Sequence, residues 1–188
     1  MLRSDKIRTQ NKEIERRLEN LKKFDKSERS SFPYWFNHWK AYNLMAKKLG
    51  VWKFKYIFHD WYKPWLRLFM PYEKVQAIHR KHANHHPEWL ENKFKKCQNC
   101  LYTNGYKYID NYDYEGTIID WECSRFTKNA KVLDAYGEYK HLFQKNVFKE
   151  KYPELFHQGC LMILQSRFLS TLEKLGLYSI ESDEWGNE

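Results

Sequence analysis

Glycine and proline, the residues that most often interrupt regular structure, are scarce in this chain, with seven and five among 188 residues. Long stretches between them repeat apolar side chains every three or four positions, a pattern typical of amphipathic helices. We therefore expect an all-α fold in one domain. The expected organisation is an N-terminal helical extension over residues 1–30, a single helical bundle over 31–180 and an acidic tail over 181–188.

Turn-forming residues delimit the expected helices. Gly50 suits the end of one helix, Pro64 lies just after another, and Pro87 is expected to interrupt the chain after a fourth. The polar segment 97–116 is expected to form a long loop with a short hairpin at 103–105. The expected helices cover 5–28, 34–49, 51–62, 72–83, 117–129, 131–147 and 153–175. An apolar stripe is expected on the first of them, formed by Ile7, Ile14, Leu18, Leu21 and Phe24.

Composition narrows the environment and the partners. Aromatic residues make up 18% of the chain, enough to build a core, and the net charge of +9 favours an anionic partner. No stretch approaches the roughly 20 apolar residues of a membrane span, and the N-terminus has no apolar signal region, so we expect a cytoplasmic protein with no membrane partner. Four cysteines should then be reduced. Cys97 and Cys100 form a CxxC pair, which alone is a weak zinc signal.

Histidines are concentrated in one part of the sequence. Six of the eight lie between residues 38 and 86, and imidazole is the commonest protein ligand of transition metals. His59 and Asp60 are adjacent in an aromatic segment, where a buried carboxylate is costly unless a cation or hydrogen bonds stabilise it. Each position also has a simpler interpretation, as a core histidine, a solvated basic face or a turn. These six residues are His38, His59, His79, His82, His85 and His86.

Three segments carry a resemblance to a known family. HDWYK at 59–63 looks like an HDxxK motif, HRKHANHHPEW at 79–89 is rich in histidine, and IIDWE at 118–122 places an aspartate on a later helix. The order H…HD…D resembles the HD-domain metal-dependent phosphohydrolase superfamily, whose fold is all-α. The HHPEW segment resembles a less-characterised group of phage and bacterial proteins within it. The similarity spans about residues 34–130.

The resemblance implies a metal centre and its ligands. The metal ligands would be His38, His59, Asp60 and Asp120. Asp134 is an alternative to Asp120, and Asp110 and Asp113 are weaker ones. The cofactor would be one or two divalent ions, with Mn, Fe, Co, Ni, Zn and Mg all open. A second ion would take ligands from among His79, His82, His85 and His86.

The implied activity is hydrolysis of a nucleotide or another small phosphate ester by a metal-activated water, as a phosphomonoesterase or a phosphodiesterase. Asp60 would orient the water, a histidine such as His82 or His86 would be the general acid, and Lys63, Arg80 and Lys81 would contact phosphate. Trp39, Trp61 or Trp89 could stack on a base, or belong to the core. One alternative function is a module that binds nucleic acid or protein with little turnover, given the aromatic and basic residues of 34–67. Another is a di-iron oxygenase. The oligomeric state is left open.

Overall fold

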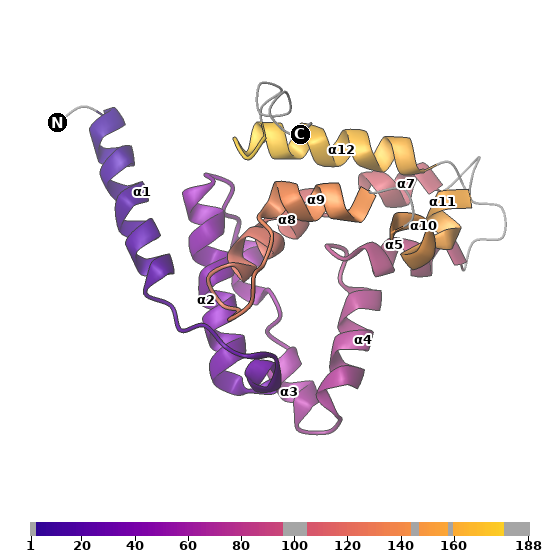
Figure 1. The fold of residues 1–188 in the computed structure, drawn as a ribbon, viewed down its shortest axis with the longest axis horizontal. Helices are drawn as coiled ribbons and strands as arrows, with labels where there is room; N and C mark the ends of the chain where they lie inside the picture. Colours follow the sequence, from indigo (N-terminus) through magenta and orange to yellow (C-terminus); the bar gives the residue numbers. More distant parts are fainter. Residues whose placement is uncertain (1–2, 96–104, 144–146, 158–159, 179–188) are drawn as a thin grey trace. The chain divides into compact units, whose positions relative to one another are not determined.

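A computed structural model describes residues 3–95, 105–143, 147–157 and 160–178. Every regular element within these ranges is helical, so the expected all-α fold is confirmed (Figure 1). Strand-like pairing among the described residues is limited to one isolated parallel bridge, between Phe24 and Lys128. No described helix has the length and apolar character that crossing a bilayer requires.

The chain forms two compact units. Unit 1 comprises Met1–Tyr72 and Ile119–Asp134, and unit 2 comprises Glu73–Ile118 and Ala135–Glu188. The chain passes from unit 2 back to unit 1 inside helix α8 (Tyr114–Ser124). The domain boundaries expected after residues 30 and 180 stay predictions, and the acidic tail over 181–188 lies outside the described residues.

Unit 1 is built around α2. Helix α1 (Arg3–Glu19) packs on α2 (Phe32–Lys48), which also contacts the 3-10 helices η1 (Lys26–Ser30) and η2 (Phe54–Phe58) and the short helix α3 (Lys63–Arg67). One hydrophobic core joins α1, α2 and η2 to the end of α8. Its members are Ile14, Leu18, Leu21, Ala41, Tyr42, Leu44, Met45, Ala46, Tyr56, Ile119 and Cys123.

Local sequence explains where α2 begins and ends. The Ser31 hydroxyl accepts a hydrogen bond from the Tyr34 N–H, and Pro33 occupies a first-turn position where its missing N–H costs nothing. At the other end Gly50 adopts a left-handed φ of 71°, which ends the helix as expected. Between these two ends the helix is continuous. Residues 34, 38 and 42, which are four apart, therefore lie in a row on one face of α2.

Unit 2 consists of shorter helices packed around aromatic and leucine side chains. Helix α5 (Pro87–Lys95) contacts α7 (Gly105–Asp110) and α11 (Pro153–His157), while α9 (Ala135–Phe143) contacts α10 (Val147–Lys151) and α12 (Leu161–Lys174). Helix α4 (Tyr72–His82) carries the first histidines of the cluster. Fully buried side chains include Leu90, Phe94, Leu155, Leu164, Phe168 and Leu172.

Several expected elements differ from those observed. The helix expected over 51–62 is wrong: η2 covers only Phe54–Phe58, and turns follow it. Asp60 adopts a left-handed φ of 61°, which an α-helix cannot contain. The first helix ends at Glu19 and not near residue 28, although Ile14, Leu18, Leu21 and Phe24 are all buried.

Further boundaries also move. Pro87 begins α5, as its fixed φ permits at a first helical position, and does not merely interrupt the chain. Part of the expected loop 97–116 is helix α7, and the helix expected over 153–175 is two helices, α11 and α12. The helix expected over 131–147 begins only at Ala135 and ends at Phe143, and the one expected over 117–129 is α8. The expected hairpin at 103–105, Cys97 and Cys100 lie outside the described residues.

Candidate metal centre

The segment that carries His59 and Asp60 is held by one row of side chains on α2. Trp35, Trp39 and Asn43 follow one another at intervals of four and therefore share a helix face. The two indole N–H groups donate to the backbone carbonyls of Asp60 (2.8 Å) and Ile57 (2.7 Å). Asn43 Nδ2 donates to the next carbonyl in this group, that of Tyr56, at 3.1 Å. This row fixes the backbone of a segment that lacks α-helical hydrogen bonds of its own.

A neighbouring row on α2 lines the candidate centre itself. Tyr34, His38 and Tyr42 are again four residues apart. The ring of His38 lies over that of Tyr34, with 6.0 Å between centroids, and the ring of His59 stacks on Tyr42 at 3.6 Å with 8° between planes. Both imidazoles are buried, with 8% of His38 and 7% of His59 exposed. Packing on tyrosine faces therefore orients both rings before any ligand is considered.

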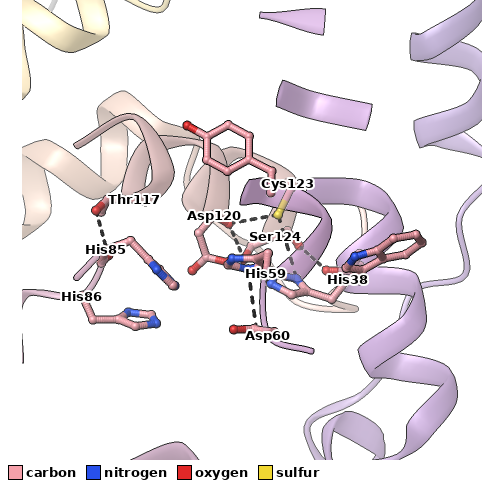
Figure 2. A network of polar contacts seen from close by, with 12 residues as sticks. His38, His59, Asp60, His85, His86, Thr117, Asp120, Cys123 and Ser124 are labelled. Carbon is pink, nitrogen blue, oxygen red and sulfur yellow. Dashed lines mark hydrogen bonds and ion pairs between the residues drawn. The ribbon is translucent and has the colours of Figure 1, made fainter. Parts of the chain in front are cut away.

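Asp120 brings the two histidines together (Figure 2). Its Oδ1 lies 2.9 Å from Nε2 of His38 and 3.9 Å from Nε2 of His59. It stands on α8, where its carbonyl accepts from Oγ of Ser124 at 2.9 Å. Histidine and carboxylate atoms are the ligands that Zn²⁺ and similar ions take. The three ligand atoms lie within 4.8 Å of one another, so this donor set fits a divalent ion.

Asp60 lies beside this group with a different partner. Its Oδ2 is 3.6 Å from Nε2 of His59 and accepts from Nζ of Lys63 at 2.6 Å. Only 2% of the Asp60 side chain and 14% of the Lys63 side chain are exposed. Burial of the carboxylate is therefore compensated by an ammonium group at contact distance. The HDxxK spacing is realised through a turn and the first residue of α3, not along one helix.

One thiol and two phenol groups near the two carboxylates are neutral. Burial, and then the negative charge of Asp120, raise the pKa of the Cys123 thiol well above its usual value; its Sγ lies 3.9 Å from Nδ1 of His38. Burial also raises the pKa of Tyr34, with Tyr72 and Asp120 adding to it, and that of Tyr62 to about 12, with Asp60 adding. These groups stay protonated near neutral pH. The anionic ligands available to a cation here are thus carboxylates.

Unit 2 gathers a second group of histidines. Nε2 of His79 lies 2.8 Å from Nε2 of His86, and the ring of His85 lies 5.3 Å from that of His79. One ring nitrogen from each of the three lies within 4.8 Å of the others. The segment is held by Thr117, whose hydroxyl donates to the His85 carbonyl at 2.7 Å (Figure 2). His82 is exposed on α4 and lies outside this group.

The other predicted residues are placed as follows. Arg80 and Lys81 are exposed on α4, and Nη1 of Arg80 lies 3.5 Å from a carboxylate oxygen of Glu88. Among the alternatives to Asp120, the exposed Asp134 belongs to no ligand group found among the described residues. Asp113 Oδ1 accepts from the Gly116 N–H at the start of α8. Asp110 is exposed in unit 2 and forms an ion pair with Arg167 at 2.9 Å. The predicted roles in general acid catalysis and phosphate binding stay predictions.

Sequence reasoning missed the residues that support the centre. The sequence patterns assign Trp35, Asn43, Tyr42 and Cys123 no role at the centre, and they assign Trp39 only a stacking or core role. A usable signal was present, since two rows of polar or aromatic residues repeat every four positions through 34–43, around His38. What the pattern cannot show is that the row 35, 39 and 43 donates hydrogen bonds to backbone carbonyls.

Comparison with known proteins adds no assignment. No family model, no curated protein and no solved structure matched this chain.

Proposed function

We propose that the chain is a metal-dependent phosphohydrolase that acts on a nucleotide or another small phosphate ester. The observation that supports this best is the convergence of His38, His59 and Asp120 from three separate elements of unit 1, with Asp60 and Lys63 beside them. The resemblance of H…HD…D to the HD-domain superfamily points the same way.

Each residue has a role that follows from its contacts. His38, His59 and Asp120 would hold a divalent ion, with Asp60 as a fourth ligand or as the group that positions the attacking water. A divalent ion bound in such a site lowers the pKa of a coordinated water and polarises a phosphoryl oxygen. Lys63 would donate to a phosphate oxygen, and Asp60, which accepts from its ammonium group, keeps that group at the centre.

Metal content and activity of the same preparations test the proposal. Protein purified without chelators is analysed by mass spectrometry for bound metals and assayed with p-nitrophenyl phosphate, its bis ester and a nucleotide panel. We expect about one metal ion per chain or more, and chelation should abolish hydrolysis in a way that added metal restores. The two chromogenic esters separate monoesterase from diesterase activity.

Matched substitutions locate the centre. His59→Ala and Asp120→Asn should lower both metal content and activity by at least about tenfold, since each removes a ligand. His141→Ala and Asp134→Asn remove the same side chains at exposed positions and should change neither. Full metal content and activity in His59→Ala and Asp120→Asn would show that the ligands lie elsewhere.

A further inference from the structure

Unit 1 exposes an unusual number of large aromatic side chains. Within residues 32–69, eight aromatic residues are exposed, from 38% at Trp52 to 82% at Phe69. Rings of this size are normally buried, and a concentration of exposed rings in one stretch of the chain indicates a candidate interaction surface. We call these residues, together with the exposed cations Lys53, Lys55 and Arg67, the aromatic–basic surface. Its rings are Phe32, Phe36, Trp52, Phe54, Phe58, Trp61, Trp65 and Phe69.

Ring contacts and hydrogen bonds connect the rings of α2 with those that follow. Phe32 packs on Trp35 at 5.3 Å between centroids, and Phe36 packs on Trp39 at 5.6 Å. The same two indoles bind the backbone carbonyls of residues 60 and 57. The exposed ring of Phe58 directly follows one of these carbonyls and contacts Phe54 at 5.6 Å. Trp35 and Trp39 therefore link the exposed rings on α2 to the segment that carries the exposed rings of η2.

The charge of this region is almost entirely positive. Between residues 32 and 72 the one acidic residue is Asp60, which is buried beside Lys63. Seven basic residues lie in the same range, of which Lys53, Lys55 and Arg67 are exposed next to the rings in sequence. The seven basic residues are Lys40, Lys47, Lys48, Lys53, Lys55, Lys63 and Arg67. A surface with this excess of positive charge attracts a polyanion.

We propose that the aromatic–basic surface binds single-stranded nucleic acid. Exposed rings offer faces on which unpaired bases stack, and the interspersed lysine and arginine side chains contact the phosphates. A duplex hides its base faces, so it cannot use the rings. Eight of the nine large apolar residues exposed within 32–69 are aromatic, Leu68 being the ninth, so the surface offers mainly planar ring faces. This proposal does not depend on hydrolysis by the metal centre.

Fluorescence anisotropy with a labelled single-stranded 12-mer of thymidine, and one of uridine, tests the proposal. We expect binding that weakens steeply as salt rises, with a much weaker signal for a duplex of equal length. Trp61→Leu combined with Trp65→Leu keeps apolar area but removes two planar faces, and should weaken binding at least about tenfold. Trp61→Phe combined with Trp65→Phe should retain most of the affinity.

Controls separate the surface from general effects. Met162→Ala removes an apolar side chain that is 79% exposed outside the surface and should leave affinity unchanged. Lys53→Gln with Lys55→Gln should weaken binding and reduce its salt dependence, whereas Lys131→Gln with Lys151→Gln, at positions that are also exposed, should weaken binding less. His59→Ala should bind the 12-mer normally even if it loses metal, so the two proposals fail separately.

Three results would overturn the proposal. The first is unchanged affinity in the leucine variant. The second is binding to vesicles of phosphatidylserine and phosphatidylcholine without binding to either 12-mer, which would identify a membrane-facing surface. The third is self-association in sedimentation, lost in the leucine variant, without binding to either 12-mer.

Discussion

Asp60 combines two demands that few residues can meet. Its backbone has a left-handed φ of 61°, and its carboxylate is buried against Lys63 and beside His59. Aspartate and asparagine tolerate this backbone region better than other residues that carry a Cβ. The residue type is thus suited to the conformation as well as to the chemistry.

Substitutions at Asp60 can separate these two contributions. Asp60→Gly and Asp60→Ala both remove the carboxylate, but only alanine is strained by the left-handed conformation, because it carries a Cβ. We expect Asp60→Ala to be less stable than Asp60→Gly by about 1 kcal/mol, in urea unfolding of the metal-free proteins. Asp60→Asn keeps the preference for the left-handed backbone, and its free energy of unfolding should differ from those of both the glycine and the alanine variant. Greater stability of the alanine variant would mean that this turn is not left-handed.

Cys123 provides a prediction about pH. Because its pKa is raised in the folded protein, the neutral thiol stabilises the fold fully below the unfolded pKa near 9, and that stability is lost as pH rises toward the folded pKa. The free energy of unfolding should therefore fall between pH 8 and pH 10.5. The fall should be smaller in Cys123→Ala, since the other titrating groups are unchanged. Equal falls in the two proteins would contradict a buried, protonated thiol.

At the scale of single residues, the sequence predicts the candidate ligands but not the residues that support them. The resemblance of H…HD…D implies His38, His59 and Asp120 as ligands, and the structure brings these three side chains together. Cys123 and Tyr42 carry no chemical signature that separates them from ordinary core residues. Their importance comes from position: Tyr42 lies 3.6 Å from the ring of His59 only because of the helix row on which it stands.

Among the elements, α2 contributes most to the candidate centre. Its row of residues 35, 39 and 43 binds three backbone carbonyls of the following segment, and its row 34, 38 and 42 lines the centre. Rows four residues apart lie side by side on a helix, so one rigid element serves both purposes.

Loss of one indole donor should loosen the segment. Trp39→Phe keeps the ring but removes the hydrogen bond to Ile57, which should cost about 1–3 kcal/mol of stability because a partly buried carbonyl loses its donor. Hydrogen exchange should also increase for amides of residues 56–61. Trp65→Phe, at an exposed position, is the matched control and should change neither measurement.

Element boundaries were predictable where a local signal decides them. The start of α2 follows from Ser31 and Pro33, and its end from Gly50. The segment 51–62 is expected to be helical, and this expectation is wrong. Side chains of α2 instead donate hydrogen bonds to its backbone carbonyls. Because these donors are distant in sequence, the periodicity of the segment itself does not reveal them.

At the scale of the molecule, the two units share the helix α8. Ile118 is the last residue of one segment of unit 2, Ile119 begins the second segment of unit 1, and both are 0% exposed. A break in the backbone hydrogen bonds of α8 would therefore remove core side chains from both units. This connection links their stabilities through the chain itself.

We accordingly expect both units to unfold in one transition. Tryptophan fluorescence reports mainly on unit 1, which holds six of the eight tryptophans, whereas far-ultraviolet circular dichroism reports on the helices of both units. The two urea curves should coincide within error. Ile118→Ala should shift both curves to lower urea concentration together. Separate midpoints would show that α8 does not couple the units.

The division of unit 1 along the chain has a consequence for synthesis. Its first segment, residues 1–72, leaves the ribosome before Asp120, Ile119 and Cys123 exist, because all of residues 73–118 are translated in between. Until then His38 and His59 lack their shared carboxylate, and the core lacks two of its buried members. During that interval the exposed aromatic residues of the nascent chain can contact other chains and aggregate. A protein truncated at residue 72 should need chaperones to stay in solution.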